Sequence, residues 1–172
     1  ILSVAGLALH PTESVTIVQY PKTEYRWSAD YLKTVAENSD QIAMMHYGPQ
    51  TLWPDHCIQD TPGAAFHKDL HIPNAELIIR KGFREEIDSY SAFFENDQTT
   101  PTGLGGYLKE RGFTKVVCVG LAFDFCVRFS AEDARKLGFQ ATVIEDACRG
   151  IDNQGSLAAA WKSMEKAGVK RL

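Results

Sequence analysis

Short apolar runs alternate with amphipathic segments along most of this chain. Apolar runs that end in turn residues predict strands over 1–9, 15–20, 41–45, 76–80, 115–119 and 140–145. Apolar residues at helical spacing, bounded by capping residues and glycines, predict helices over 28–38, 102–111, 125–137 and 156–167. Because strands and helices alternate, we expect an α/β fold of three layers (α/β/α), with a mostly parallel sheet and helices on both of its faces.

One long segment interrupts this alternation. From Tyr47 to Pro73 the chain is rich in proline, glycine, histidine and aspartate and carries no helix or strand pattern. A structureless segment of that length within a compact domain is usually functional. We therefore interpret it as a long loop that contributes to a site.

Length, charge and cysteine content narrow the class of protein. The 172 residues predict one domain spanning 1–172, and an apolar share of 44% is enough for a core. The net charge of −4 predicts no nucleic-acid partner, and no apolar run approaches the roughly 18 residues of a membrane span. The first residues lack a basic region, so we predict no signal peptide, and because the chain opens on Ile1 and not on Met we expect an incomplete N-terminus. Four cysteines in neither a disulfide nor a zinc pattern predict reduced thiols and a cytoplasmic location.

The stretch Val116–Cys126 predicts a nucleophile at the end of a buried strand. A sharp turn follows the strand, and Asp124 stands where a helix N-cap would be expected. Cys126 then falls within the first turn of the helix, where backbone N–H groups and the helix dipole lower a thiol pKa below ~8.5. The alternative is a small buried cysteine that serves only as a hydrophobe, which is the interpretation we prefer for Cys118 inside the strand.

Two further polar residues stand at predicted strand ends. Lys81 follows the run I-I-R-K and would be partly desolvated, within reach of a thiolate at the same edge of the sheet. Gly82 would let the backbone approach a ligand, and Asp146 ends another predicted strand. A lysine that merely ends a strand and points outward is the alternative for Lys81.

Aromatic and histidine residues of the loops complete the candidate set. Trp53 and Tyr90 could form flat walls for an aromatic ligand, with core packing as the alternative. His56 lies among turn residues. Its possible roles are a metal ligand or a base that contacts a ligand, and the alternative is that it has neither role. His67 and His71 lie in a proline-bounded loop and are not interpreted as a metal pair.

Several linked motifs resemble those of a known family. In chain order they are Y-G-P-Q-T-L-W-P-D-H-C-I-Q-x-T-P-G-A-x-F-H-x-D-L, I-I-R-K-G, D-S-Y-S-A-F, G-L-A-F-D-F-C-V and E-D-A-C-R-G-I-D. From about Tyr47 onward the chain resembles bacterial nicotinamidase/pyrazinamidase within the isochorismatase-like cysteine hydrolases. The resemblance implies the isochorismatase-like fold and hydrolysis of nicotinamide, and of pyrazinamide, to the acid and ammonia, as in NAD salvage.

The resemblance also implies roles for individual residues. Cys126 matches the family nucleophile and Lys81 the family lysine. Leu121–Ala122 matches a cis peptide that directs the N–H groups of Ala122 and Cys126 into an oxyanion hole. The remaining matches are Trp53 and Tyr90, which sandwich the pyridine ring, and His56, which binds a divalent metal (zinc first, with manganese and iron as alternatives).

Residues 1–46 depart from the family pattern. The family's first strand carries the triad aspartate, and no matching strand is found here. Its second strand ends in D-x-H-P, for which Leu7–Pro11 is the nearest match, with His10 as metal ligand and Ala8 in place of the metal aspartate. Phe123 stands where the family usually has a small hydroxyl residue. The explanations are a truncated chain, a misread N-terminal sequence or a pseudoenzyme, and the first two are favoured.

Three functions follow from these observations. The first is a nicotinamidase with a small-molecule substrate, acting through a cysteine thioester. The second is a related hydrolase with another small substrate, and the third is a non-catalytic binding domain. The sequence leaves a homo-oligomer open.

Overall fold

The structure is a computed structural model of the 172-residue chain. It describes residues 42–54, 56–66, 69–70, 75–82, 84 and 86–172, together with the backbone of 3–9 and 14–20. The strand predictions over 1–9 and 15–20 correspond to β1 and β2, whereas the helix predicted over 28–38 lies outside the described residues.

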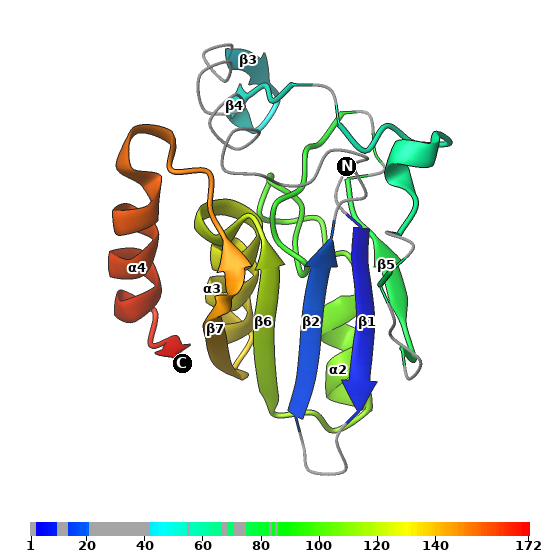
Figure 1. Cartoon of the computed structure of the whole chain (residues 1–172), viewed down its shortest axis with the longest axis vertical. Coiled ribbons are helices and arrows are strands. Elements are labelled where there is room, and N and C mark those ends of the chain that lie inside the picture. The colour runs from blue at the N-terminus through cyan, green and yellow to red at the C-terminus, as the bar shows by residue number, and fades with distance from the viewer. Residues whose placement is uncertain are drawn as a thin grey trace.

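The described strands form a six-stranded sheet and a separate hairpin (Figure 1). The sheet has the order β5-β1-β2-β6-β7-β8. The neighbours β2, β6, β7 and β8 run parallel, and β1 is antiparallel to both β2 and β5, so the prediction of a mostly parallel sheet is confirmed. The strand bounds are β1 Ser3–Leu9, β2 Ser14–Tyr20, β3 Ile42–Met45, β4 Gly48–Thr51, β5 Ile78–Arg80, β6 Lys115–Leu121, β7 Gln140–Arg149 and β8 Lys170–Arg171.

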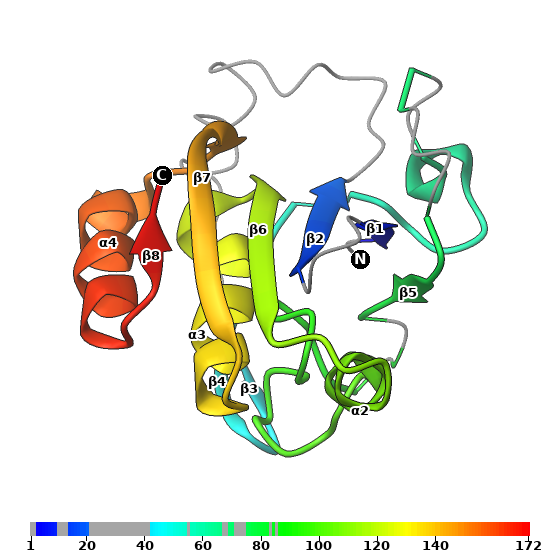
Figure 2. The same ribbon diagram turned by 90° about the horizontal axis from the view of Figure 1, so that it is seen from below.

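Helices α2 and α3 cover one face of this sheet (Figure 2). Helix α4 packs beside α3 and against the turn that precedes α3. None of the helices in the described part of the chain is long and apolar enough to cross a bilayer. The helical bounds are α2 Leu104–Glu110, α3 Arg128–Lys136 and α4 Ser156–Lys166, with short turns η1 Pro62–Ala64, η2 Phe123–Val127 and η3 Asn153–Gly155.

Two sequence predictions about the loop and its flanking strand need correction. The segment from Tyr47 to Pro73 is not without structure, because β4 pairs with β3 as an antiparallel hairpin and η1 forms a short turn. The strand predicted as buried over 76–80 is β5, which pairs with β1 at the edge of the sheet and leaves Ile78 49% exposed. An apolar run alone does not distinguish a central strand from an edge strand.

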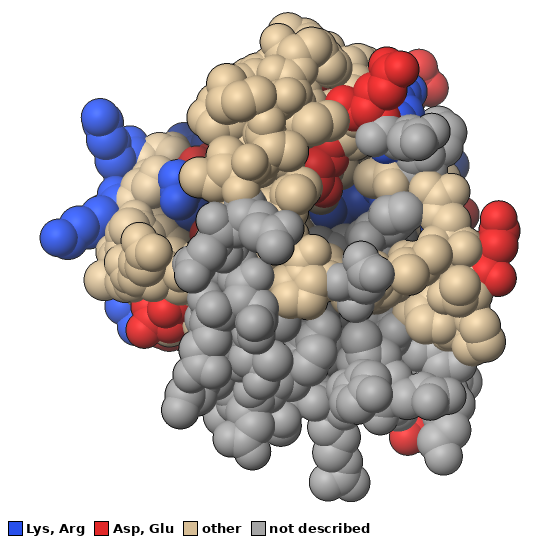
Figure 3. Space-filling view, turned by 90° about the horizontal axis from the view of Figure 1, so that it is seen from above, with Lys and Arg blue, Asp and Glu red and all other residues tan. Residues whose placement is uncertain are grey.

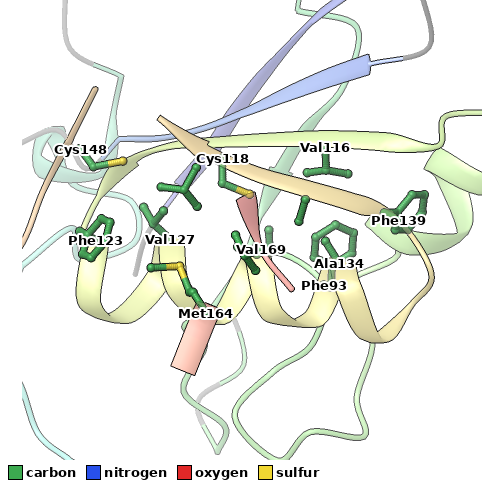
Figure 4. Packing of buried hydrophobic residues seen from close by; sticks show 14 of the residues in the cluster. Phe93, Val116, Cys118, Phe123, Val127, Ala134, Phe139, Cys148, Met164 and Val169 are labelled. Carbon is green, nitrogen blue, oxygen red and sulfur yellow. The ribbon is translucent and has the colours of Figure 1, made fainter. Parts of the chain in front are cut away.

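The core lies between α3, α4 and the strands β6 and β7 (Figure 4). Val116 and Cys118 of β6 face Val127 and Ala134, which come from η2 and α3, and Met164 of α4 closes the cluster. The Met164 side chain is 0% exposed. This packing fixes the helix after β6 and therefore the turn η2 at its start.

The Asp124 carboxylate connects η2 to the loop after β7 and does not cap a helix. Its carboxylate is 0% exposed and accepts hydrogen bonds from the backbone N–H of Ile151 at 3.0 Å and of Asp152 at 2.8 Å, and from the Ser156 hydroxyl. The N-cap of η2 is Ala122, so the prediction of Asp124 as the N-cap was wrong. Ser156 likewise does not cap α4, whose N-cap is Gly155 at φ 82°.

We predict that Met164→Ala lowers the free energy of unfolding by about 2–5 kcal/mol, because it leaves a cavity in a fully buried site. Met44→Ala is the matched control, since Met44 is 78% exposed, and should cost less than about 0.5 kcal/mol. Urea unfolding followed by circular dichroism measures both. Equal losses for the two variants would contradict the assignment of the core.

Asp124→Asn should destabilise the fold by about 1–3 kcal/mol, because an amide NH₂ group would then face a buried backbone N–H. Asp146→Asn provides the control, since Asp146 is exposed on β7. Thermal unfolding of both variants checks the prediction. A variant at position 124 that is as stable as the control would show that these hydrogen bonds contribute nothing.

Candidate active site

The carboxyl ends of the parallel strands form the end of the molecule at which the candidate residues lie. Figure 3 views the chain from this end. Most described side chains on this face are uncharged, and acidic and basic groups border a hollow near its centre. Ligands in open α/β sheets bind at this edge, as the sequence analysis expected.

Cys126 is positioned by the connection from β6 to α3. The peptide bond Leu121–Ala122 at the end of β6 is cis, at the position where the resemblance implies one. The turn η2 follows, and Cys126 is its fourth residue, with the backbone N–H of Ala122 directed at Sγ. The Cys126 carbonyl accepts a hydrogen bond from the Ser130 hydroxyl at 2.6 Å, which ties the turn to the first turns of α3.

Lys81 lies directly after β5 and reaches Cys126. Its side chain is 1% exposed, so the alternative of an outward-pointing lysine is wrong. The ammonium Nζ donates to the backbone oxygen of Ser89 and lies 3.8 Å from Sγ of Cys126. A buried ammonium requires such partners, because its removal from water is costly otherwise. The sequence prediction that the two residues meet at one edge of the sheet is confirmed.

The predicted direction of the Cys126 pKa was wrong. Burial raises the pKa of the Cys126 thiol, and this effect exceeds the opposing influences of the Lys81 ammonium and the Ala122 N–H. The residue is only 2% exposed, so the thiolate loses most of its hydration. The sequence correctly placed Cys126 in the connection that follows β6, although it lies four residues after the N-cap Ala122 and not two after Asp124, and the depth of its burial was not visible there.

Trp53 and Tyr90 meet at an angle rather than as parallel walls. Trp53 Nε1 donates to the Tyr90 hydroxyl at 2.9 Å, and the two ring planes are inclined by 70°. Phe125, the neighbour of Cys126, packs edge-on against both, with ring centroids 4.8 Å from Trp53 and 5.7 Å from Tyr90. These three rings form an aromatic corner beside the nucleophile candidate. In this arrangement Trp53 and Tyr90 do not sandwich a ring between parallel faces.

Phe125 was missed by the sequence analysis. Its partner Trp53 lies far away in the chain, and an aromatic residue one position before a cysteine gives no local signal of that contact. Asp146, in contrast, was proposed for the same crevice, but it lies within β7, which continues to Arg149, and it is exposed. Phe123 is buried against Trp161, at a ring distance of 4.8 Å, and so serves as a core residue.

One ring nitrogen of His56 is engaged by the backbone. Its Nδ1 lies 2.6 Å from the carbonyl oxygen of Pro54, which leaves Nε2 to face other partners. Burial lowers the pKa of His56, so the neutral imidazole needed of a metal ligand is favoured. Within the described ranges no three His, Cys, Asp or Glu side chains are grouped to hold a metal ion. His10, the second predicted ligand, lies outside the described residues, as do His67 and His71.

The chain is similar to a family model and to characterised proteins. The model described as the isochorismatase domain matches residues 29–171. A curated nicotinamidase of Acinetobacter baylyi is 57% identical over 162 residues, which cover 93% of this chain and 74% of that protein. A solved nicotinamidase/pyrazinamidase of Acinetobacter baumanii has 58% identity and a TM-score of 0.76 over 78% of this chain and 65% of that one.

Two more distant solved structures contain ligands. A protein of L. infantum in complex with nicotinate is 41% identical, with a TM-score of 0.67 over 70% of this chain and 60% of that chain. A pyrazinamidase of Pyrococcus horikoshii in complex with zinc is 32% identical, with a TM-score of 0.59 over 70% of this chain and 63% of that chain. The chain thus spans between 60% and 65% of these three solved chains. The family match over residues 29–171 and the identity to the Acinetobacter baylyi protein establish that the chain belongs to the isochorismatase domain family.

Proposed function

We propose that this chain hydrolyses nicotinamide, and pyrazinamide, to the carboxylic acid and ammonia. The observation that carries the proposal is the buried Lys81 ammonium at 3.8 Å from Sγ of Cys126. The nicotinamidase relatives and the nicotinate complex of the L. infantum protein support a pyridine amide as the substrate. The aromatic corner of Trp53, Tyr90 and Phe125 supplies an apolar surface beside the sulfur for such a ring.

The reaction proceeds in two halves. Sγ of Cys126 attacks the amide carbonyl carbon, and the carbonyl oxygen becomes an oxyanion held by the backbone N–H groups of Ala122 and Cys126. The C–N bond then breaks, and the nitrogen takes the proton that the thiol gave up. Ammonia departs, and the acyl group remains on Cys126 as a thioester. Water cleaves the thioester to the acid and restores the thiol. The Lys81 ammonium stabilises the thiolate during attack. This attraction offsets part of the effect of burial, which raises the pKa of the Cys126 thiol.

We also propose a divalent metal as cofactor, with zinc first and manganese or iron as alternatives. The zinc complex of the Pyrococcus horikoshii protein supports a divalent metal. His56 presents a neutral imidazole of the required kind, but the described residues supply no complete ligand set. His10 remains the predicted second ligand. No step above depends on the metal, which would activate a bound water when present.

A single domain and a cytoplasmic location also remain proposals. Cys118, Cys126 and Cys148 form no disulfide, which supports a reducing compartment.

A non-catalytic binding domain is the second candidate, and one observation favours it. The strands β1 and β2 lie between β5 and β6, and neither contains an aspartate or glutamate that could act as the triad base. In that case Cys126 would react with alkylating reagents no faster than an ordinary buried thiol.

Cys126→Ala should lower kcat for ammonia release from nicotinamide by about 10⁴-fold or more, because the nucleophile is lost. Cys118→Ala is the matched control, since the core contact of Cys118 is unconnected with the reaction. A coupled ammonia assay on the full-length protein measures both. If the unmodified protein releases no ammonia, or the variant at position 126 retains activity, the proposal is wrong.

Lys81→Met should move the pH midpoint of Cys126 alkylation upward. The sign follows because the Lys81 cation lowers the pKa of Cys126, so its removal leaves the effect of burial unopposed. Iodoacetamide labelling followed by mass spectrometry of the Cys126 peptide gives the midpoint. Lys166→Met, at an exposed position of α4, should leave it in place. An unchanged midpoint in Lys81→Met would show that the two groups are not coupled.

A further inference from the structure

Gln50 is a buried polar side chain that the proposed reaction does not use. It lies on β4 and is 6% exposed. Its amide nitrogen Nε2 has three acceptor oxygens within hydrogen-bond distance. They are the Tyr90 hydroxyl and Asp88 Oδ2, both at 2.8 Å, and the Thr51 carbonyl at 2.9 Å. An amide carries two hydrogens, so these three acceptors share them and hold the group in one orientation.

The amide oxygen of Gln50 is held as well. It accepts from Asn96 Nδ2 at 2.9 Å and from the Tyr47 hydroxyl at 3.1 Å. Asn96 Oδ1 in turn accepts from the backbone N–H of Tyr90 at 2.8 Å. Both the nitrogen and the oxygen of the Gln50 amide therefore connect the β3–β4 hairpin to the loop that carries Tyr90. A fully satisfied buried network of this kind specifies one arrangement of the groups that it joins.

The aromatic corner depends on this arrangement. The Tyr90 hydroxyl accepts from Gln50 and also from Trp53 Nε1 at 2.9 Å. Gln50 therefore fixes the oxygen on which the orientation of the Trp53 ring depends. Loss of the amide would remove one of the contacts that hold the Tyr90 hydroxyl, and with it part of what fixes the 70° angle between the two rings.

The nucleophile is held by different contacts. Lys81 donates to the Ser89 carbonyl, and Cys126 is held by η2 and by the Ser130 hydroxyl. The Ser89 N–H is bound by Asp88 Oδ1 at 2.7 Å, on the oxygen that Gln50 does not contact. The two halves of the site meet at Asp88 through different oxygens, so a change at Gln50 that leaves Asp88 in place tests the half that carries the rings.

We propose that Gln50 is a positioning residue that fixes Tyr90 and Trp53 and thereby sets the affinity for a flat heteroaromatic amide. The identity of this ligand rests on the proposed function, whereas the geometry of the network is independent of it. Gln50 acts through the two rings and has no role in the chemistry at Cys126.

The test measures binding without turnover. In a Cys126→Ala background of the full-length protein, Gln50→Leu should weaken nicotinamide binding about tenfold, the size expected when one or two such hydrogen bonds are lost. Isothermal titration calorimetry gives Kd. Gln140→Leu is the matched control at an exposed position of β7, and should bind like the parent. An unchanged Kd in Gln50→Leu, or no nicotinamide binding by the parent, would overturn the inference.

A charge exchange keeps the test independent of folding defects. Gln50→Glu places two carboxylates side by side at positions 50 and 88 and should weaken binding at least as much as Gln50→Leu. Adding Asp88→Asn restores one donor facing one acceptor between positions 50 and 88, although the Thr51 carbonyl still faces a carboxylate oxygen, so Kd should improve about threefold or more over Gln50→Glu alone. Failure of the double variant to recover binding, while both variants are folded, would contradict the positioning role.

The alkylation rate of Cys126 separates positioning from a general structural role. With Cys126 present, Gln50→Leu should change this rate by less than about twofold, because Gln50 contacts Asp88 Oδ2, whereas Asp88 Oδ1 and the Ser89 carbonyl hold the Lys81 side of the site. A fall in parallel with binding would mean that Gln50 merely maintains the fold. If the protein binds nicotinamide through Gln50 but releases no ammonia, the proposed function fails and this inference stands.

Discussion

The site depends on one buried interaction, that of the Lys81 ammonium with the sulfur of Cys126. A cation that is 1% exposed is tolerated only where the protein replaces its water. Here the Ser89 carbonyl and the sulfur do so. The same burial raises the pKa of the thiol, so each group is costly alone. Beside the Lys81 ammonium the thiolate, which is the form that attacks a carbonyl, costs less than it would in the same buried site without that cation.

The surrounding fold holds the two groups and the ring surface by separate means. Asp124 anchors η2 to the loop after β7, which fixes the backbone of Cys126. The Gln50 network joins the β3–β4 hairpin to the loop of Tyr90. Core packing between α3 and the strands β6 and β7 fixes the start of α3 (Figure 4). The contacts that set reactivity and those that set ligand affinity therefore come from different parts of the chain, and they meet at Asp88.

Local sequence patterns predicted the elements and the pair at their ends. Lys81 and Cys126 each follow an apolar run, and parallel strands finish at one edge, so their meeting could be inferred. What failed depended on distant residues. Asp124 was predicted as an N-cap from its place just before a helical pattern. Its actual partner Ile151 lies 27 positions away, so nothing in the local sequence indicated that contact. The Cys126 pKa was predicted in the wrong direction because burial is a property of the packed chain. Gln50 gave no signal, since Tyr90 lies 40 positions along.

The most direct test of this account is to trap the covalent intermediate. The full-length protein is mixed with excess nicotinamide, quenched in acid during turnover, digested and analysed by mass spectrometry. The account predicts a nicotinoyl group on the peptide that contains Cys126, and its absence in a Lys81→Met variant whose attack step is slowed. A nicotinoyl group on another residue, or ammonia release with an unmodified Cys126 throughout, would contradict it.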